Sequence, residues 1–113
     1  MESGKYMFKY QYVKRHIKDA VECLCIGEGD VRSRLKAAND VTCNLVDHHF
    51  PEELLPIWEK IQGKLTKYGP CKDSQGKIAE GSVSHTLRRI RNSTASEIAS
   101  LILQLHYLLE KDY

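Results

Sequence analysis

The stretch from Tyr6 to Ile26, YMFKYQYVKRHIKDAVECLCI, decides the fold. Its regularly spaced apolar residues are Tyr6, Tyr10, Val13, Ile17, Ala20 and Leu24. Alternating steps of four and three positions place these residues along one face of an α-helix. Three later stretches show the same spacing, and helices with one apolar face are stabilised when those faces pack together. The sequence therefore predicts an all-α fold, an antiparallel four- or five-helix bundle, with a single helical domain over residues 1–113.

The composition is typical of a soluble globular protein. Apolar residues make up 42% and charged residues 28% of the 113 positions. No apolar run approaches the roughly 20 residues that cross a bilayer, and the N-terminal residues lack the apolar block of a signal peptide. The net charge is +2 with both signs interleaved, so the composition does not demand an anionic partner. We expect a cytoplasmic protein that does not bind membranes.

A short glycine-rich connection follows the first helix. Gly27 stands where a residue in the left-handed conformation usually ends a helix, and Asp30 stands where it can cap the next one. Because the link between the two helices has only four residues, they are expected to form an antiparallel hairpin. The apolar stripe of the second helix consists of Val31, Leu35, Ala38, Val41 and Leu45.

The third helix is expected to run from Pro56 to about Tyr68. A short turn beginning at Pro51 precedes it, since proline is tolerated in the first turn of a helix but not deeper. Gly63 lies inside this helix and either marks a close helix crossing or has no packing role. The inner face consists of Leu54, Trp58, Ile61 and Leu65.

The helical pattern is absent between Gly69 and Gly81. Within this segment the residues Asp73-Ser74-Gln75-Gly76 favour a tight turn, because aspartate and glycine suit the backbone geometry of such turns. We therefore expect a short hairpin-like loop between the third and fourth helices. Irregular connections of this length are often functional or mobile.

The last apolar stripe is compatible with two structures. It consists of Val83, Leu87, Ile90, Thr94, Ile98, Leu101, Leu105 and Leu108. We favour one continuous helix over residues 82–112, because the stripe keeps to one face. The alternative is a break near Asn92-Ser93, with Thr94-Ala95-Ser96-Glu97 forming a capping box for a new helix. A continuous helix would extend past its neighbours and favour a dimer, whereas a broken one gives a five-helix monomer.

The four cysteines are expected to be reduced. Cys23, Cys25 and Cys43 lie in apolar helical stretches, as buried thiols often do, and only Cys71 is expected in a loop. Zinc sites usually use paired ligands separated by two to four residues, and this chain lacks such pairs. We expect neither a metal nor a cofactor.

The densest polar cluster is the predicted binding site. Its residues are His85, Arg88, Arg89, Arg91 and Asn92. On a continuous helix Arg88, Arg91 and Asn92 share one face, and His85 and Arg89 share another. Such a group can clamp a phosphate or a carboxylate with paired hydrogen bonds. The alternative is a solvated helix face whose arginines pair with acidic residues of neighbouring helices.

The pair Arg91-Asn92, on a late helix of a small all-α domain, resembles the start of the motif of HEPN-family ribonucleases. In that motif an arginine is followed after a few residues by a histidine on the same helix. Only these two residues match the motif, because Ser93 to Ala99 contain no histidine and His106 is too distant to replace it, so we do not assign the chain to that family. A small ribonuclease-like enzyme that uses His85 and Arg91 near the loop at residues 69–81 is one alternative function, with no catalytic residue assigned.

The leading hypothesis is a small, non-enzymatic helical interaction or regulatory protein. It would bind a protein partner or a second copy of itself, and it rests on a well-specified core, a balanced charge and the lack of a recognisable catalytic set. The other alternative is a nucleic-acid-binding protein that uses the basic cluster at residues 88–91, joined by Lys72 and Lys77. Neutralised phosphates would then make the affinity fall steeply with salt.

Overall fold

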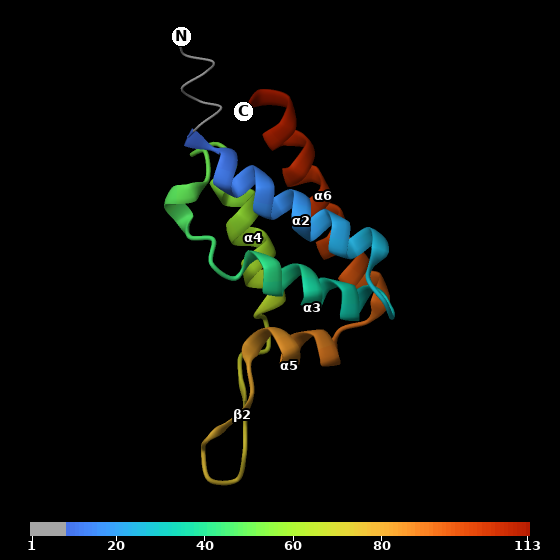
Figure 1. Cartoon of the computed structure of the whole chain (residues 1–113). Helices are drawn as coiled ribbons and strands as arrows, with labels where there is room; N and C mark the ends of the chain where they lie inside the picture. Colours follow the sequence, from blue (N-terminus) through green and yellow to red (C-terminus); the bar gives the residue numbers. More distant parts are fainter. Residues whose placement is uncertain (1–8) are drawn as a thin grey trace.

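The computed structural model describes residues 9–113, and their architecture is an all-α bundle with one small hairpin (Figure 1). The elements are α2 (Gln11–Ile26), α3 (Val31–Thr42), the 3-10 helix η1 (Asp47–His49), α4 (Leu55–Leu65), β1 (Cys71–Lys72), β2 (Ile78–Glu80), α5 (Ser82–Arg89) and α6 (Asn92–Asp112). Helix α6 packs against α2, α3 and α4, while α5 packs against α3 and α4. The predicted fold class is confirmed.

Helices α2 and α3 form the predicted antiparallel hairpin (Figure 1). The beginning of the predicted first helix, at Tyr6, lies outside the described residues. Asp30 caps α3 as predicted, since its Oδ1 accepts a hydrogen bond from the Ser33 N–H at 3.0 Å. The predicted left-handed conformation of Gly27 is wrong: its backbone is extended, with φ −66° and ψ 156°. The left-handed residue is Gly29, with φ +84°, because the reversal of direction occurs there.

The core lies where the apolar faces of α2, α3, α4 and α6 meet. Ile17, Leu35, Ile61 and Leu105 are fully buried there, one from each helix. Most of the predicted stripes face this core. Leu24, Val31 and Val41 are half-buried at its edge, and Leu45 is buried beyond the end of α3. The period of three and four therefore identified the buried sides of these helices.

Helix α4 begins close to the predicted position. The Pro51 carbonyl accepts hydrogen bonds from the N–H groups of Leu54 and Leu55 and so forms the predicted preceding turn. Pro56 lies in the first helical turn. The N–H groups of this turn have no partner within the helix, so the N–H that proline lacks costs α4 no hydrogen bond. The helix ends at Leu65, earlier than predicted. Gly63 marks no helix crossing, because a Cβ atom there would have nothing within 4 Å.

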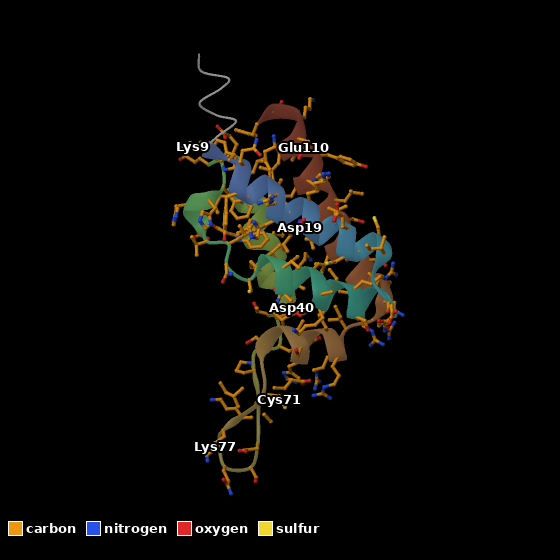
Figure 2. The ribbon with its side chains drawn as sticks, viewed as in Figure 1. Lys9, Asp19, Asp40, Cys71, Lys77 and Glu110 are labelled. Carbon is orange, nitrogen blue, oxygen red and sulfur yellow. The ribbon has the colours of Figure 1, made fainter. Side chains whose placement is uncertain are left out.

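The predicted hairpin is present as β1 and β2, which pair antiparallel. Asp73 closes its turn by accepting hydrogen bonds from the N–H groups of Gln75 and Lys77, both at 2.9 Å. Gly76 adopts φ +81°, a conformation that glycine takes without strain. The hairpin projects away from the helices (Figure 1), and Figure 2 shows Lys77 near its tip and Cys71 closer to its base.

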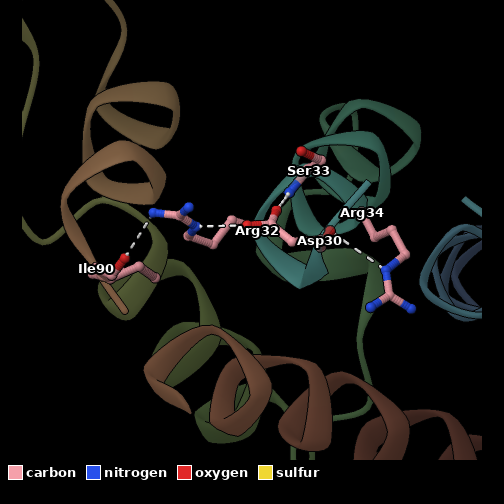
Figure 3. A network of polar contacts seen from close by, with 5 residues as sticks. All are labelled: Asp30, Arg32, Ser33, Arg34 and Ile90. Atoms are coloured by element: carbon pink, nitrogen blue, oxygen red, sulfur yellow. Dashed lines mark hydrogen bonds and ion pairs between the residues drawn. The ribbon is translucent and has the colours of Figure 1, made fainter. Parts of the chain in front are cut away.

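The chain breaks between α5 and α6, so the prediction of one continuous helix is wrong. Ile90 and Arg91 are extended, with ψ 159° and 161°. The Ile90 carbonyl, which a continuous helix would use internally, instead accepts a hydrogen bond from Arg32 Nη1 of α3 at 3.3 Å (Figure 3). The predicted capping box is wrong as well, because Thr94 lies inside α6 and the break precedes Asn92.

The break changes which side of the last helix is buried. The buried residues of α6 are Ala95, Ile98, Ile102, Leu105 and Leu109. Leu101 and Leu108, which belong to the predicted stripe, are only half-buried. With the stripe divided between two helices, the argument for a dimer from an overhanging continuous helix no longer holds.

The end of α6 is fixed to the rest of the bundle by Tyr113. Its ring packs edge-on against Tyr10, with ring centroids 5.2 Å apart, and its hydroxyl donates a hydrogen bond to Glu53 Oε2 at 2.6 Å. This hydrogen bond is the main reason that the pKa of Tyr113 is raised to about 12 and that the pKa of the Glu53 carboxyl is lowered. These two tyrosines contribute to the fold, and Tyr10 is buried.

The cysteines differ from the prediction in their burial. All four thiols are unbridged, but Cys25 and Cys43 are exposed and Cys23 and Cys71 are intermediate. Cys25 lies in the last turn of α2, Cys43 follows the end of α3, and Cys71 belongs to β1 instead of a loop. Among residues 9–113, no three His, Cys, Asp or Glu side chains are grouped to hold a metal ion. None of the described helices is long and apolar enough to cross a bilayer.

Candidate functional site

The break between α5 and α6 separates the predicted site residues. Arg88 turns toward the hairpin, where its Nε and Nη2 atoms each lie 3.0 Å from Glu80 Oε1. Arg91 lies in the extended link and Asn92 is the first, exposed residue of α6. The predicted common face of Arg88, Arg91 and Asn92 is therefore wrong, because the helix that would align them ends at Arg89.

His85 holds the backbone that follows α4. Its Nδ1 lies 2.9 Å from the Gly69 carbonyl oxygen, which can only accept, so Nδ1 carries the proton. The neighbouring Thr86 is fully buried, and its Oγ1 accepts a hydrogen bond from the Tyr68 N–H at 3.1 Å. These two hydrogen bonds fix the corner between α4 and the hairpin. Arg91 lines a cavity in this region, and His85 is not among the residues that line it.

A cavity of about 270 Å³ lies beside this corner. We call it the basic hollow, and its charged and aromatic lining consists of Lys64, Lys67, Tyr68, Arg89 and Arg91. The two lysines come from the last turn of α4 and the residues after it, and the two arginines flank the break between α5 and α6. Tertiary structure thus brings together cations that are more than twenty positions apart in the sequence.

Within residues 9–113, the cations of the basic hollow are not paired with carboxylates. No Asp or Glu of this range lines the cavity, and none of the three ion pairs found there involves its lysines or arginines. Like charges gathered in this way repel one another, and an anion that binds between them relieves the repulsion. The hollow therefore has the electrostatic character of an anion-binding site.

A larger cavity between α3 and α5 provides the contrast. Its volume is about 580 Å³, and it also contains three cationic side chains: Arg32, Lys36 and Arg88. Each of them pairs with a carboxylate, on Asp30, Asp40 and Glu80 respectively. The predicted alternative had the arginines paired with acidic residues of neighbouring helices. Arg88 does pair with a carboxylate, but Glu80 belongs to strand β2, and among residues 9–113 Arg89 and Arg91 form no ion pair.

The first turn of α6 adds positive potential to the basic hollow. The first N–H groups of a helix have no partner within it, and the N-cap residue Arg91 makes no side-chain hydrogen bond to them. The first turn contains no acidic residue, and Thr94 in this turn lines the hollow. The positive end of a 21-residue helix and four cationic side chains thus act on the same space.

Three residues of the basic hollow were not predicted from the sequence: Lys64, Lys67 and Tyr68. The lysines lie three positions apart and flank a tyrosine at a helix end, but nothing in the sequence connects them with residues 89–91. Conversely, the predicted contributors Lys72 and Lys77 do not line the hollow. Lys72 belongs to β1, and Figure 2 shows Lys77 on the projecting hairpin.

A second cluster of titratable side chains joins α2 to η1. The rings of Tyr12 and His49 have centroids 4.8 Å apart, and His48 lies 4.5 Å from His49. Partial burial is the main cause that lowers the pKa of His49 from its ordinary value of 6.5. The charges of His48 and His16 lower this pKa further. The Val46 N–H also donates a hydrogen bond to His49 Nδ1 at 3.0 Å, which requires this nitrogen to be unprotonated.

We expect the free energy of unfolding to decrease as the pH falls below the ordinary histidine value of 6.5. In that window the unfolded chain binds a proton at His49 that the folded chain resists, so protonation favours unfolding. Urea denaturation at about pH 7.5 and 5.5 measures this difference. His49→Asn removes the titration and keeps an acceptor at the position of Nδ1, so it should reduce the pH dependence. An unchanged dependence in this variant would contradict the assignment.

Comparison of the chain with protein-family models, with curated proteins and with solved structures gives no match.

Proposed function

We propose that this protein binds nucleic acid by holding backbone phosphates in the basic hollow. The observation that carries the proposal is the convergence of Lys64, Lys67, Arg89 and Arg91 on one cavity that no carboxylate of the described chain lines. Arginine and lysine side chains with helix N-terminal amides are the groups that usually contact phosphate oxygens. The small net charge of +2 does not oppose this function, because the local arrangement of charge decides the attraction at short range.

The alternative role for these cations is to neutralise the negative ends of α4 and α5. Lys64 and Arg89 do lie in the last turns of those helices. Elsewhere in the described chain, arginines near helix ends bind carbonyl groups directly: Arg34 Nη1 donates to the Leu24 carbonyl at 2.9 Å. The side chains of the hollow make no such hydrogen bond within residues 9–113, which leaves their donors available to a ligand.

The salt dependence of binding tests the proposal. Fluorescence anisotropy of a labelled single strand of about 12 nucleotides is measured over about 50–200 mM salt. The double variant Arg89→Ala/Arg91→Ala should reduce the slope of log affinity against log salt by about 1.4, at about 0.7 for each lost phosphate contact. Weaker binding should accompany the smaller slope.

The matched control is Lys36→Ala/Arg88→Ala. It removes two cations as well, but from the cavity where they already pair with Asp40 and Glu80. This variant should bind nearly as the wild type does. Equal losses in the two double variants would indicate a general charge effect and contradict a site at the basic hollow, as would the absence of binding at low salt.

Protein binding is the second candidate function. Leu103 and Tyr107 lie one turn apart on α6 and are 37% and 63% exposed, so they form an apolar strip on its outer face. Such a strip suits a partner helix or a second copy of the chain. Light scattering tests self-association: a monomeric mass at all accessible concentrations would exclude the second copy.

A further inference from the structure

We infer that the basic hollow selects single-stranded nucleic acid by stacking one nucleobase on the ring of Tyr68. The inference rests on the proposed function and adds a second kind of contact to it. Tyr68 lines the hollow and is 41% exposed, so part of its aromatic ring is open to a ligand among the four cations. A charged groove combined with an exposed aromatic ring is the usual arrangement for single-strand binding.

The backbone that carries Tyr68 is held in place before any ligand binds. The Tyr68 N–H is bound by the buried Thr86 hydroxyl at 3.1 Å, and the next carbonyl, on Gly69, accepts from His85 at 2.9 Å. Gly69 makes the corner with φ +63°. The His85 ring also lies edge-on to the Tyr68 ring, with centroids 6.4 Å apart. A platform fixed in this way loses little conformational freedom when a base stacks on it.

Two cations of the basic hollow lie over the Tyr68 ring. Arg89 Cζ is 5.1 Å and Lys67 Nζ is 5.5 Å from the ring centroid. A cation over an exposed aromatic ring favours that position by only about two- to fivefold. A base stacked on such a ring raises the binding affinity by about five- to 150-fold. A base can therefore replace one of these cations on the ring. The displaced side chain stays in the hollow, where it meets the phosphate next to that base.

This arrangement distinguishes a single strand from a duplex. In a duplex the faces of the bases are covered by their neighbours, so the cations can still contact the phosphates but no base can stack on the Tyr68 ring. In a single strand a base can rotate out and place its face on the ring. Since every base has such a face, stacking predicts little dependence on sequence.

The test compares a single strand of about 12 nucleotides with a duplex of the same length by fluorescence anisotropy at low salt. We expect Tyr68→Ala to weaken single-strand binding by about 5- to 150-fold and to leave duplex binding unchanged. Tyr68→Phe, which keeps the ring, should bind as the wild type does. The salt slope of Tyr68→Ala should also stay the same, because no charge is removed.

Two further variants keep the result interpretable. Tyr68→Leu retains apolar bulk without a planar ring, and it should show the same loss as Tyr68→Ala even if the alanine variant folds poorly. Tyr12→Ala removes a tyrosine of α2 that is 44% exposed and does not line the basic hollow, and it should leave the affinity for both nucleic acids unchanged. The thermal unfolding of each variant verifies that its fold is intact.

The outcomes separate this inference from the proposed function. If Tyr68→Leu binds the single strand as tightly as the wild type does, or if single strand and duplex bind equally, the stacking inference is overturned while phosphate binding in the hollow stands. If neither nucleic acid binds at low salt, both the proposed function and the inference fail.

Discussion

Replacing Ile17 by alanine is expected to lower the free energy of unfolding by about 2–5 kcal/mol, a large part of the total for a domain of this size. Ile17 is fully buried on the inner face of α2. It borders a gap of about 10 Å³ whose other lining residues include Trp58 and Ile61 of α4 and Ile102 of α6. Truncation there removes apolar contacts with two other helices and leaves a cavity that their fixed backbones cannot fill.

Urea denaturation followed by circular dichroism measures the loss. The control is Ile26→Ala, because Ile26 is 82% exposed and its truncation should change the stability by less than about 0.5 kcal/mol. Leu101→Ala should fall between the two, since Leu101 is half-buried. Equal effects of Ile17→Ala and Ile26→Ala would mean that the apolar face of α2 does not point into a shared core.

The same substitution at two glycines is expected to have opposite effects. In Gly27→Ala the new Cβ atom would lie 2.5 Å from the backbone oxygen of Cys23, so the end of α2 must shift at a cost of about 1–3 kcal/mol. In Gly63→Ala the Cβ atom meets nothing within 4 Å and occupies an exposed helical position. Alanine restricts the unfolded chain more than glycine does and should stabilise the protein by about 1 kcal/mol.

The difference between these two variants, measured by urea denaturation, tests the backbone at each position. A gain of stability in Gly27→Ala would show that the close approach to the Cys23 oxygen does not exist in solution. A loss in Gly63→Ala would show that another side chain packs against the outer face of α4.

Much of the fold follows from local sequence patterns. The apolar period identified the inner faces of α2, α3 and α4, because a helix places residues three and four apart on the same side wherever it occurs. The cap at Asp30 and the turn closed by Asp73 were equally predictable. Both depend on side chains that bind amide groups only a few positions away.

The break between α5 and α6 was not predictable in the same way. Neither Ile90 nor Arg91 is a residue that interrupts helices, and the apolar spacing continues across them. Two distant contacts favour the break: Ile90 is buried in the core, and Arg32 Nη1, 58 positions away, donates to its carbonyl (Figure 3). A hydrogen bond from another helix replaces the one that a continuous helix would make.

The candidate site, too, was predictable from the sequence only in part. Arg89 and Arg91 were identified from the sequence as part of a basic cluster, and both line the basic hollow. Arg88, their neighbour in the sequence, belongs elsewhere because the end of α5 directs it to Glu80. Lys64 and Lys67 line the site only because α4 packs beside the break between α5 and α6. Sequence thus identified the kind of charge but not which charges would be paired.

The sequence by itself determined the helical class, the inner faces of the first three helices and the turn closed by Asp73, because each depends on groups within a few positions of one another. Tertiary structure alone decided where the last stripe breaks, which arginines have carboxylate partners, and that Tyr68 lies among the remaining cations. These outcomes depend on contacts between helices far apart along the chain, and no local pattern encodes the geometry of those contacts.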